Sequence, residues 1–303
     1  MNNTPPPGET IRIGTLAGKG PRTAEYIQAI LPHGFESFQI NFWQNLQGTD
    51  LKKLADELNA FLPASGAVVS SLGMFGNPLG DQPIDEETRK GWEACIDNAH
   101  LFGCNLVCGF AGRVRHKPVP ESIPVFKKVF GELVKRAADK GVRIAFENCQ
   151  MGGSWATGDW NIAFNPTAWT LMFDAVNADN IGLEWEPCHQ MTQLIDPLPQ
   201  LREWIGKVFH VHGKDASIYR DVISRHGLES GRPWVEHRTP GFGDTDWTTV
   251  IGELRRGGYE GAIDIEGWHD PIYQGSLEMT GQVHALEYLR RCRTRHVANP
   301  AGF

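Results

Sequence analysis

The stretch Val208–Asp215 (VFHVHGKD) carries two histidines that a β-strand would place on one face. Successive side chains of a strand point to opposite faces, so His210 and His212 share one face while Phe and Val occupy the other. The strand is expected to give way to a loop at Gly-Lys-Asp. Ionisable side chains at the C-terminal end of a buried parallel strand are typical of barrel and doubly wound enzymes. A hydrogen-bonded core histidine is the alternative, and it suits the deeper His210 better than His212.

Three further predicted strands end with an inward-facing carboxylate, at Glu147, Glu186 and Glu266. With His212 they would meet at one end of a barrel, where three carboxylates cannot all stay ionised without a counter-charge. A divalent cation supplies that charge. Three oxygen donors and one imidazole favour a fairly hard ion such as Mn²⁺, Mg²⁺ or Co²⁺, and Zn²⁺ also fits. Glu184 has the same parity as Glu186 and is the rival ligand, while a strand-end salt bridge would explain any one glutamate alone.

The elements that must position these residues alternate along the whole chain. Eight short runs with strand character each precede a segment whose apolar residues recur at helical spacing. The predicted strands are 11–15, 35–40, 67–72, 105–110, 142–147, 181–186, 207–212 and 262–266; the predicted helices are 23–30, 50–61, 85–102, 120–140, 166–175, 197–204, 246–256 and 277–293. Asp85 is the expected N-cap of the third helix. Eight such units predict a single α/β domain over residues 1–303, a (β/α)8 TIM barrel, with residues 1–9 extended or disordered.

Two long loops interrupt this pattern, at residues 149–165 and 213–244. Both leave the C-terminal ends of predicted strands, which is the end of a barrel where its enzymes keep their active sites. Loops of this length inside a compact domain are commonly functional. We therefore expect both loops to cover the predicted site.

The composition excludes several classes of protein. Among 303 residues, 29 basic and 36 acidic side chains give a net charge of −7, which disfavours a nucleic-acid surface. The six cysteines show no zinc-finger or CxxC spacing and predict reduced thiols and a cytoplasmic protein. The polar, Pro-rich N-terminus lacks the apolar region of a signal peptide, and no run is long and apolar enough to predict a membrane helix.

Five motifs occur in order along the second half of the chain: VRIAFENCQM (142–151), IGLEWEPCHQ (181–190), VFHVHGKDA (208–216), RTPGFGDTDW (238–247) and GYEGAIDIEG (258–267). Their order and spacing resemble the xylose isomerase-like barrel family, described broadly as sugar phosphate isomerases and epimerases and grouped with the AP endonuclease family 2 superfamily. The resemblance implies one divalent metal ion, Mn²⁺ above the others, with Glu147, Glu186, His212 and Glu266 as its ligands. Glu186 stands where the family's D-P-x-H pattern has Asp.

The resemblance also implies chemistry beside a carbonyl. A metal that chelates a sugar carbonyl and a neighbouring hydroxyl acidifies the C–H between them and stabilises the enediolate. Glu147 and Glu266 would flank the substrate, one removing a proton and the other returning it. The predicted substrate contacts are His189, Lys214, Arg238, His116 and Trp268, with His269, Trp155 and Trp160 as further candidates; ordinary loop, surface or packing roles are the alternatives.

Three other functions compete with a sugar epimerase or isomerase. A lyase would begin with the same proton abstraction, on a 3-keto glycoside, and then expel the C1 substituent by β-elimination. An endonuclease relative would need more His and Asp ligands and a basic groove, which the sequence lacks. A non-catalytic partner subunit would bind no metal. The predicted partner is a small sugar or sugar derivative. The family resemblance implies a dimer or tetramer, and both a homo-oligomer and a hetero-oligomer stay open.

Overall fold

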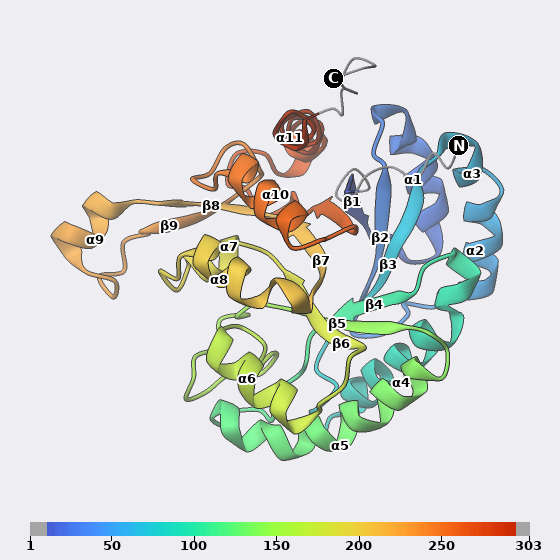
Figure 1. The fold of residues 1–303 in the computed structure, drawn as a ribbon, viewed down its shortest axis with the longest axis horizontal. Helices are drawn as coiled ribbons and strands as arrows, with labels where there is room; N and C mark the ends of the chain where they lie inside the picture. The colour runs from blue at the N-terminus through green and yellow to red at the C-terminus, as the bar shows by residue number, and fades with distance from the viewer. Residues whose placement is uncertain (1–10, 295–303) are drawn as a thin grey trace, which may run out of the picture.

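Eight parallel strands close into a barrel in the computed structural model, which describes residues 11–294 (Figure 1). The strand order around the barrel is β1-β10-β7-β6-β5-β4-β3-β2, and every neighbouring pair is parallel. The predicted TIM barrel is therefore confirmed. The expectation for residues 1–9 lies outside the described residues.

The observed elements follow the predicted order, with some shifted ends. The barrel strands are β1 (Arg12–Ala17), β2 (Ser37–Trp43), β3 (Val68–Phe75), β4 (Leu106–Gly109), β5 (Arg143–Glu147), β6 (Ile181–Trp185), β7 (Val208–Gly213) and β10 (Ala262–Ile265). The α-helices are α1 (Thr23–Ile30), α2 (Leu51–Asn59), α3 (Leu62–Ser65), α4 (Pro83–Asn98), α5 (Val119–Ala138), α6 (Pro166–Ala175), α7 (Cys188–Met191), α8 (Pro197–Trp204), α9 (Arg220–His226), α10 (Trp247–Arg256) and α11 (Glu278–Arg293).

The predicted N-cap of α4 is wrong by three residues. Gln82 caps the helix, because Pro83 takes the first helical position, where a missing N–H costs nothing. Asp85 is the third helical residue, and its carboxylate accepts a hydrogen bond from the Gln82 backbone N–H at 2.9 Å. The two residues form a reciprocal capping box.

The main apolar core lies between the strands and the surrounding helices. Phe146 of β5 packs edge-on against Phe130 of α5, with ring centroids 4.7 Å apart, and Phe126 and Trp92 complete the aromatic group. All four side chains are fully buried. Aromatic side chains bury large apolar areas, so this layer anchors β5, the strand that ends at Glu147.

The barrel interior, in contrast, contains a layer of buried polar side chains that bond to one another. His210 lies between Asp264 and Glu184, with each carboxylate 2.9 Å from one ring nitrogen. The amide N–H of Gln39 donates to Glu184, and Ser37 donates to Asp264 at 2.5 Å. Buried polar groups are stabilised by pairing, and these side chains pair with one another, although Glu184 Oε2 is buried without a hydrogen-bond partner. His210 is thus a core histidine, as the alternative interpretation held, although its partners are carboxylates.

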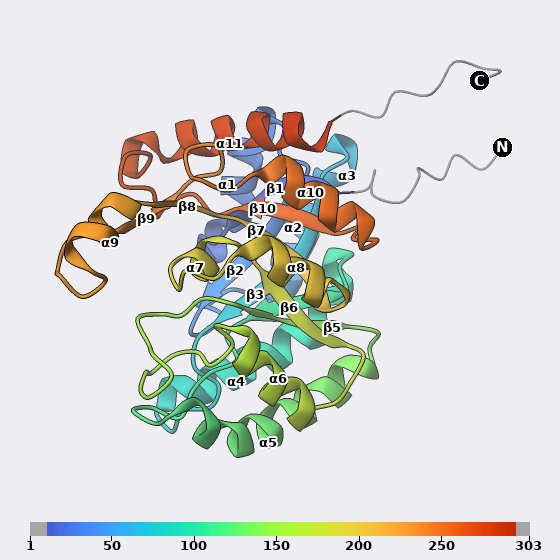
Figure 2. The ribbon, with the colours of Figure 1, turned by 60° about the vertical axis from the view of Figure 1, so that its left-hand side comes forward.

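The second long loop, residues 213–244, folds into an arm instead of an irregular cover. Strand β8 (Asp215–Ile218) pairs antiparallel with β9 (Val235–Arg238), and α9 lies between them. Figures 1 and 2 show this arm projecting away from the barrel and its helices. The other long loop, 149–165, contains no helix or strand. All six cysteines are free, and no helix within residues 11–294 has the length and hydropathy of a membrane span.

Candidate active site

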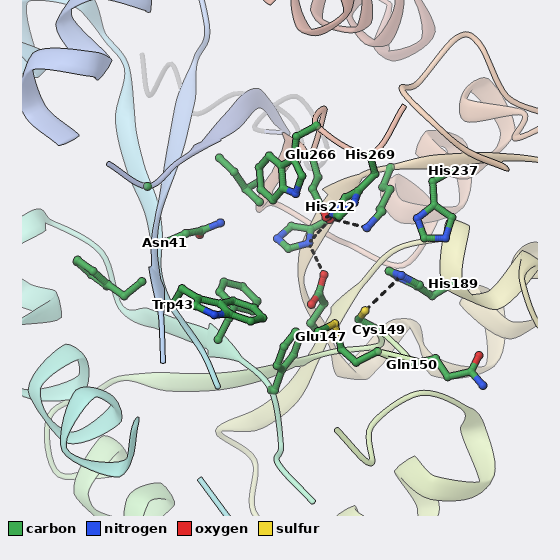
Figure 3. A pocket seen from close by; sticks show the side chains of 18 of the residues that line it. Asn41, Trp43, Glu147, Cys149, Gln150, His189, His212, His237, Glu266 and His269 are labelled. Carbon is green, nitrogen blue, oxygen red and sulfur yellow. Dashed lines mark hydrogen bonds and ion pairs between the residues drawn. The ribbon is translucent and has the colours of Figure 1, made fainter. Parts of the chain in front are cut away.

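Three buried side chains converge at the C-terminal mouth of the barrel. Glu147 ends β5, His212 lies near the end of β7, and Glu266 directly follows β10. His212 Nδ1 is 3.1 Å from Glu147 Oε1 and 3.4 Å from Glu266 Oε2 (Figure 3). All three residues are at most 5% exposed. The structure thus brings together three of the four predicted metal ligands.

The chemistry of these donors fits a divalent cation. One ligand atom from each of Glu147, His212 and Glu266 lies within 4.8 Å of the others, and Glu266 Oε2 is buried without a hydrogen-bond partner. Burial raises the pKa of Glu147; the His212 imidazole offsets part of that shift and the Glu266 carboxylate adds to it. Two carboxylates this close repel each other, and a cation between them removes the repulsion.

His212 is oriented from its other ring nitrogen. Nε2 donates to Gln39 Oε1 at 2.7 Å and is 3.1 Å from Glu184 Oε1. Burial alone would lower the pKa of His212, but the surrounding carboxylates outweigh it and hold that pKa well above its usual value. While Nε2 donates to Gln39, Nδ1 faces Glu147 and Glu266. Such a bond to the remote nitrogen commonly fixes the tautomer of a metal-binding histidine.

The rival ligand Glu184 therefore lies behind His212, in the polar layer inside the barrel. Glu186 lies apart from the three-residue group, beside α7. Its carboxylate accepts from the His189 backbone N–H at 3.0 and 3.1 Å and pairs with the His189 ring. Burial raises the pKa of Glu186 to about 8, which Lys214 partly offsets. The Glu186 side chain is fully buried, and the side-chain amide of Asn148 also donates to its carboxylate at 3.4 Å.

Lys214 contributes a buried positive charge to the mouth. Its Nζ lies 2.7 Å from Glu266 Oε1, and the residue is 2% exposed. Burial acts to raise the pKa of Glu266, but Lys214 and His212 outweigh it and hold that pKa well below its usual value. An ammonium fixed in this place favours negative charge on a neighbouring ligand atom.

A cavity of about 840 Å³ opens over these groups. One side carries three imidazoles, from His189, His237 and His269. His269 Nε2 lies 2.9 Å from Glu266 Oε1, and His189 Nε2 lies 3.2 Å from Cys149 Sγ. Burial, reinforced by Lys214, lowers the pKa of both His189 and His237 to about 3, so both rings are neutral at pH 7. Neutral imidazoles both donate and accept hydrogen bonds, as a polyhydroxylated ligand requires.

The predicted substrate contacts divide into two groups. His189, Lys214 and Trp268 line the cavity, as does the further candidate His269. The structure places His116 and Arg238 outside it. His116 is an exposed loop residue 3.1 Å from Asp159, and Arg238 forms a 3.0 Å ion pair with Asp270.

Sequence reasoning missed several cavity residues. Trp43 and Phe75 end strands that were predicted three residues too short, so their position at the mouth went unrecognised. Phe110 ends the predicted fourth strand, and alternation along that strand was the available signal. His237 lies on β9 of the arm, and no local signal marks it.

Comparison with known proteins shows the family. The profile of the xylose isomerase-like TIM barrel family matches residues 27–292, and the chain belongs to that family. Among curated proteins, it is 25% identical over 260 residues to the uncharacterized protein YfiH of Bacillus subtilis, which covers 75% of this chain and 79% of that protein. It is also 25% identical over 186 residues to inosose dehydratase of Clostridium tetani, which covers 57% of this chain and 58% of the dehydratase.

Solved structures share the fold at lower identity. A xylose isomerase domain protein from Planctomyces limnophilus superposes with a TM-score of 0.69 at 19% identity, over 94% of this chain and 97% of that one. The 3-keto-D-glucoside 4-epimerase YcjR of E. coli gives 0.67 at 16% identity, over 93% and 100%. IolI, solved with a bound zinc atom, gives 0.62 at 15% identity, over 92% and 96%. Among these proteins, the names give two reaction types, a dehydratase and a sugar epimerase.

Proposed function

We propose that this protein is a divalent-metal-dependent sugar epimerase or isomerase that abstracts a proton beside a carbonyl. The observation that carries the proposal is the buried group of Glu147, His212 and Glu266 at the floor of a cavity large enough for a sugar. Two carboxylates and an imidazole in that position can bind a divalent cation, and the carboxylates can also transfer protons to and from a substrate.

The proposed metal site consists of Glu147, His212 and Glu266, and Glu186 is the fourth ligand that the family resemblance implies. Oxygen-rich donors favour Mn²⁺, and Zn²⁺ is compatible with the imidazole. A cation held there would polarise a carbonyl oxygen and lower the pKa of the adjacent C–H. Glu186 would bind the metal through its carboxylate, which is paired with the His189 ring. His189 is the proposed contact to a substrate hydroxyl.

The proposed proton transfers use the chain's own carboxylates. Glu147 and Glu266 approach His212 from different strands, β5 and the end of β10, and the proposal is that a sugar carbon bound above His212 would lie between the two carboxylates. One carboxylate removes the proton to give an enediolate, and the other delivers a proton to the opposite face, which inverts the carbon. Lys214 would stabilise the enediolate oxygen by its charge.

The second candidate is a lyase, and one observation favours it. Three curated matches beyond YfiH are named inosose dehydratase, and a dehydratase eliminates water after abstracting a proton beside a ketone. The first step is the same for epimerisation and for β-elimination, including elimination from a 3-keto glycoside. The outcome depends on whether an acid protonates the carbon or the leaving group.

The test is a metal analysis followed by a substrate screen in D₂O. The purified protein is loaded with Mn²⁺, Co²⁺ or Zn²⁺ and incubated with free ketoses, with inososes and with 3-keto glycosides, and products are read by NMR and mass. The epimerase is supported if the sugar gains deuterium at the carbon beside the carbonyl and its mass does not change in any other way. Loss of water or of an aglycone makes the protein a lyase. Absence of both bound metal and exchange would indicate a non-catalytic partner subunit.

A further inference from the structure

The side of the cavity opposite the imidazoles is a row of aromatic rings. Phe75 lies 6.3 Å from the His212 ring, Phe110 lies 5.2 Å from Phe75, and Trp43 lies 6.2 Å from Phe110, all between ring centroids. Trp160 backs the indole of Trp43 at 5.4 Å. In Figure 3, Trp43 lies across the His212, Glu147 and Glu266 group from His189 and His237. The row leads from the reactive centre toward solvent.

The backbone that carries Trp43 is held in one conformation. The next residue, Gln44, has a φ of 63°, a left-handed value that is uncommon outside glycine. The turn is fixed by three hydrogen bonds: Gln44 N–H to Phe75 O at 2.7 Å, Asn45 N–H to Trp43 O at 2.8 Å, and Thr88 hydroxyl to Gln44 O at 2.6 Å. Unfavourable backbone conformations that surroundings hold in place are concentrated at ligand sites.

Trp43 is nevertheless left open to the cavity. It is 46% exposed, whereas Phe75 and Phe110 are 7% and 3% exposed, so the indole is the accessible end of the row. Beside it, Asn41 lines the same cavity, and its side-chain Oδ1 is buried without a hydrogen-bond partner. A large flat apolar surface next to an unsatisfied amide is suited to a ring that carries polar substituents.

The cavity also exceeds what one monosaccharide fills. Its volume of about 840 Å³ lies in the upper part of the range of about 300–1,000 Å³ that drug-sized ligands occupy. Charged and imidazole groups surround one part, and the aromatic row forms another. We infer that the substrate has two parts: the sugar that reacts at Glu147, His212 and Glu266, and a second ring, joined to it, that stacks on Trp43.

This inference deepens the proposed function and rests on it for the placement of the reacting sugar. The second ring can be a sugar chair, which offers a face of C–H groups, or a planar aromatic aglycone; both stack on indole. Asn41 would bond to hydroxyl groups of the former and to ring substituents of the latter. A free ketose or inosose would leave Trp43 uncovered.

The experiment measures binding to the metal-loaded protein, so it does not depend on turnover. Matched pairs of methyl and phenyl β-glycosides, from glucose, galactose and xylose, are titrated by calorimetry, together with cellobiose and lactose. For the sugar that binds best, we expect the ring-bearing ligand to bind about tenfold more tightly than the methyl glycoside. A preference for phenyl glycosides identifies an aromatic aglycone, and a preference for disaccharides identifies a second sugar.

Variants assign the effect to Trp43. Trp43→Ala should abolish the preference for the ring and leave the affinity for the methyl glycoside within twofold, while Trp43→Phe should keep part of the preference. The control is Trp155→Ala, since Trp155 is 39% exposed on the neighbouring loop and does not line the cavity. Should Trp43→Ala fail to fold, Trp43→Leu replaces it, because leucine retains bulk without an aromatic face.

The outcomes separate this inference from the proposed function. Three outcomes would each overturn the two-part substrate. They are equal affinities for the two ligands of every pair, no binding by any glycoside, and equal losses of affinity for methyl and phenyl ligands in Trp43→Ala. Deuterium exchange into free ketoses without any ring preference would leave the proposed function standing and remove the inference. A ring preference that depends on Trp43, with no deuterium exchange into any sugar, would support the inference and contradict the proposed function.

Discussion

At the scale of single residues, the site depends on how three buried groups share charge. Glu147 and Glu266 face the same nitrogen of His212, but only Glu266 is also paired with Lys214. Accordingly the pKa of Glu147 is raised, chiefly by burial, while that of Glu266 is held well below its usual value. The two carboxylates therefore have different protonation tendencies, which suits a pair that removes and returns a proton.

The first prediction concerns Glu266→Gln. The amide keeps the size of the side chain but cannot take up a proton, so solvent-deuterium exchange into the substrate should fall by a factor of about 10²–10⁴. The circular dichroism spectrum should match that of the wild type. Glu229→Gln, on the exposed part of the arm, is the control and should exchange at the wild-type rate. Full exchange in Glu266→Gln would remove this residue from the mechanism.

The second prediction concerns His212→Ala. The variant loses the nitrogen donor of the proposed metal site and leaves Glu147 and Glu266 facing each other unscreened, so the metal content of the purified protein should fall. Elemental analysis after equilibrium dialysis measures it. His226→Ala, on the exposed helix α9, should retain the wild-type content. A stoichiometric metal in His212→Ala would show that the ligands are elsewhere.

At the scale of elements, the last helix is joined to the start of the barrel by one carboxylate. Glu36, just before β2, accepts from Arg293 at 2.6 and 3.0 Å and from Arg290 at 3.1 Å, and it also accepts from the Ile13 backbone N–H of β1. These contacts hold α11 against the seam where β1 meets β2. Arg290 and Arg293, at the end of α11, thus have a structural role within the chain.

The third prediction concerns the pH dependence of this link. Burial acts to raise the pKa of Glu36, but Arg293, Ile13 and Arg290 outweigh it, so the folded-state pKa lies below the ordinary value of 4.5. The stabilisation is therefore fully present above that value and is lost as the pH falls through the folded-state pKa. Glu36→Gln should lower the free energy of unfolding by about 1–3 kcal/mol at pH 7.

Urea unfolding at pH 7 and near pH 3 measures this effect. The difference between wild type and Glu36→Gln should narrow toward pH 3, because the stabilisation from the ionised carboxylate is lost progressively as the pH falls below 4.5. Glu57→Gln is the matched control, since its partner Lys53 is exposed and 3.8 Å away, and it should cost less than about 0.5 kcal/mol. A difference that does not change with pH would mean that the charge of Glu36 contributes nothing.

At the scale of the whole molecule, a metal at the barrel mouth would join three strands that are distant in the chain. Glu147, His212 and Glu266 come from β5, β7 and the end of β10. A ligand that binds only the folded state stabilises it by RT ln(1 + [L]/Kd), about 2.7 kcal/mol at a hundredfold excess over Kd. The proposed site therefore couples metal binding to global stability.

The fourth prediction is that a chelator lowers the melting temperature. At a hundredfold excess of metal over Kd, the metal-loaded protein should melt on the order of 5 °C above the stripped protein, by differential scanning calorimetry. Restoring Mn²⁺ should restore the difference, and His212→Ala should show none. Equal melting temperatures with and without saturating metal would contradict the site.

Much of the barrel and part of the site follow from the sequence alone. Alternation along a strand decides which side chains face inward, and this rule by itself puts Glu147, His212 and Glu266 on the inner face. The βα repetition likewise predicts the strand order, since sequential parallel strands joined by helices close in only a few ways. Strand ends were predicted less well than strand order. Strand β2 was predicted three residues too short, which concealed Trp43 at its end.

The tertiary structure decided what alternation cannot, namely the height of each side chain along the barrel axis. Glu147 pairs in register with Glu184, and His212 with Asp264, because the strands are tilted and staggered. That stagger puts Glu184 behind His212. The folding of the arm brings His237 to the cavity from a segment that the sequence presents as a loop. Parity is a local property of each strand, whereas height and mutual distance arise only when all eight strands close together.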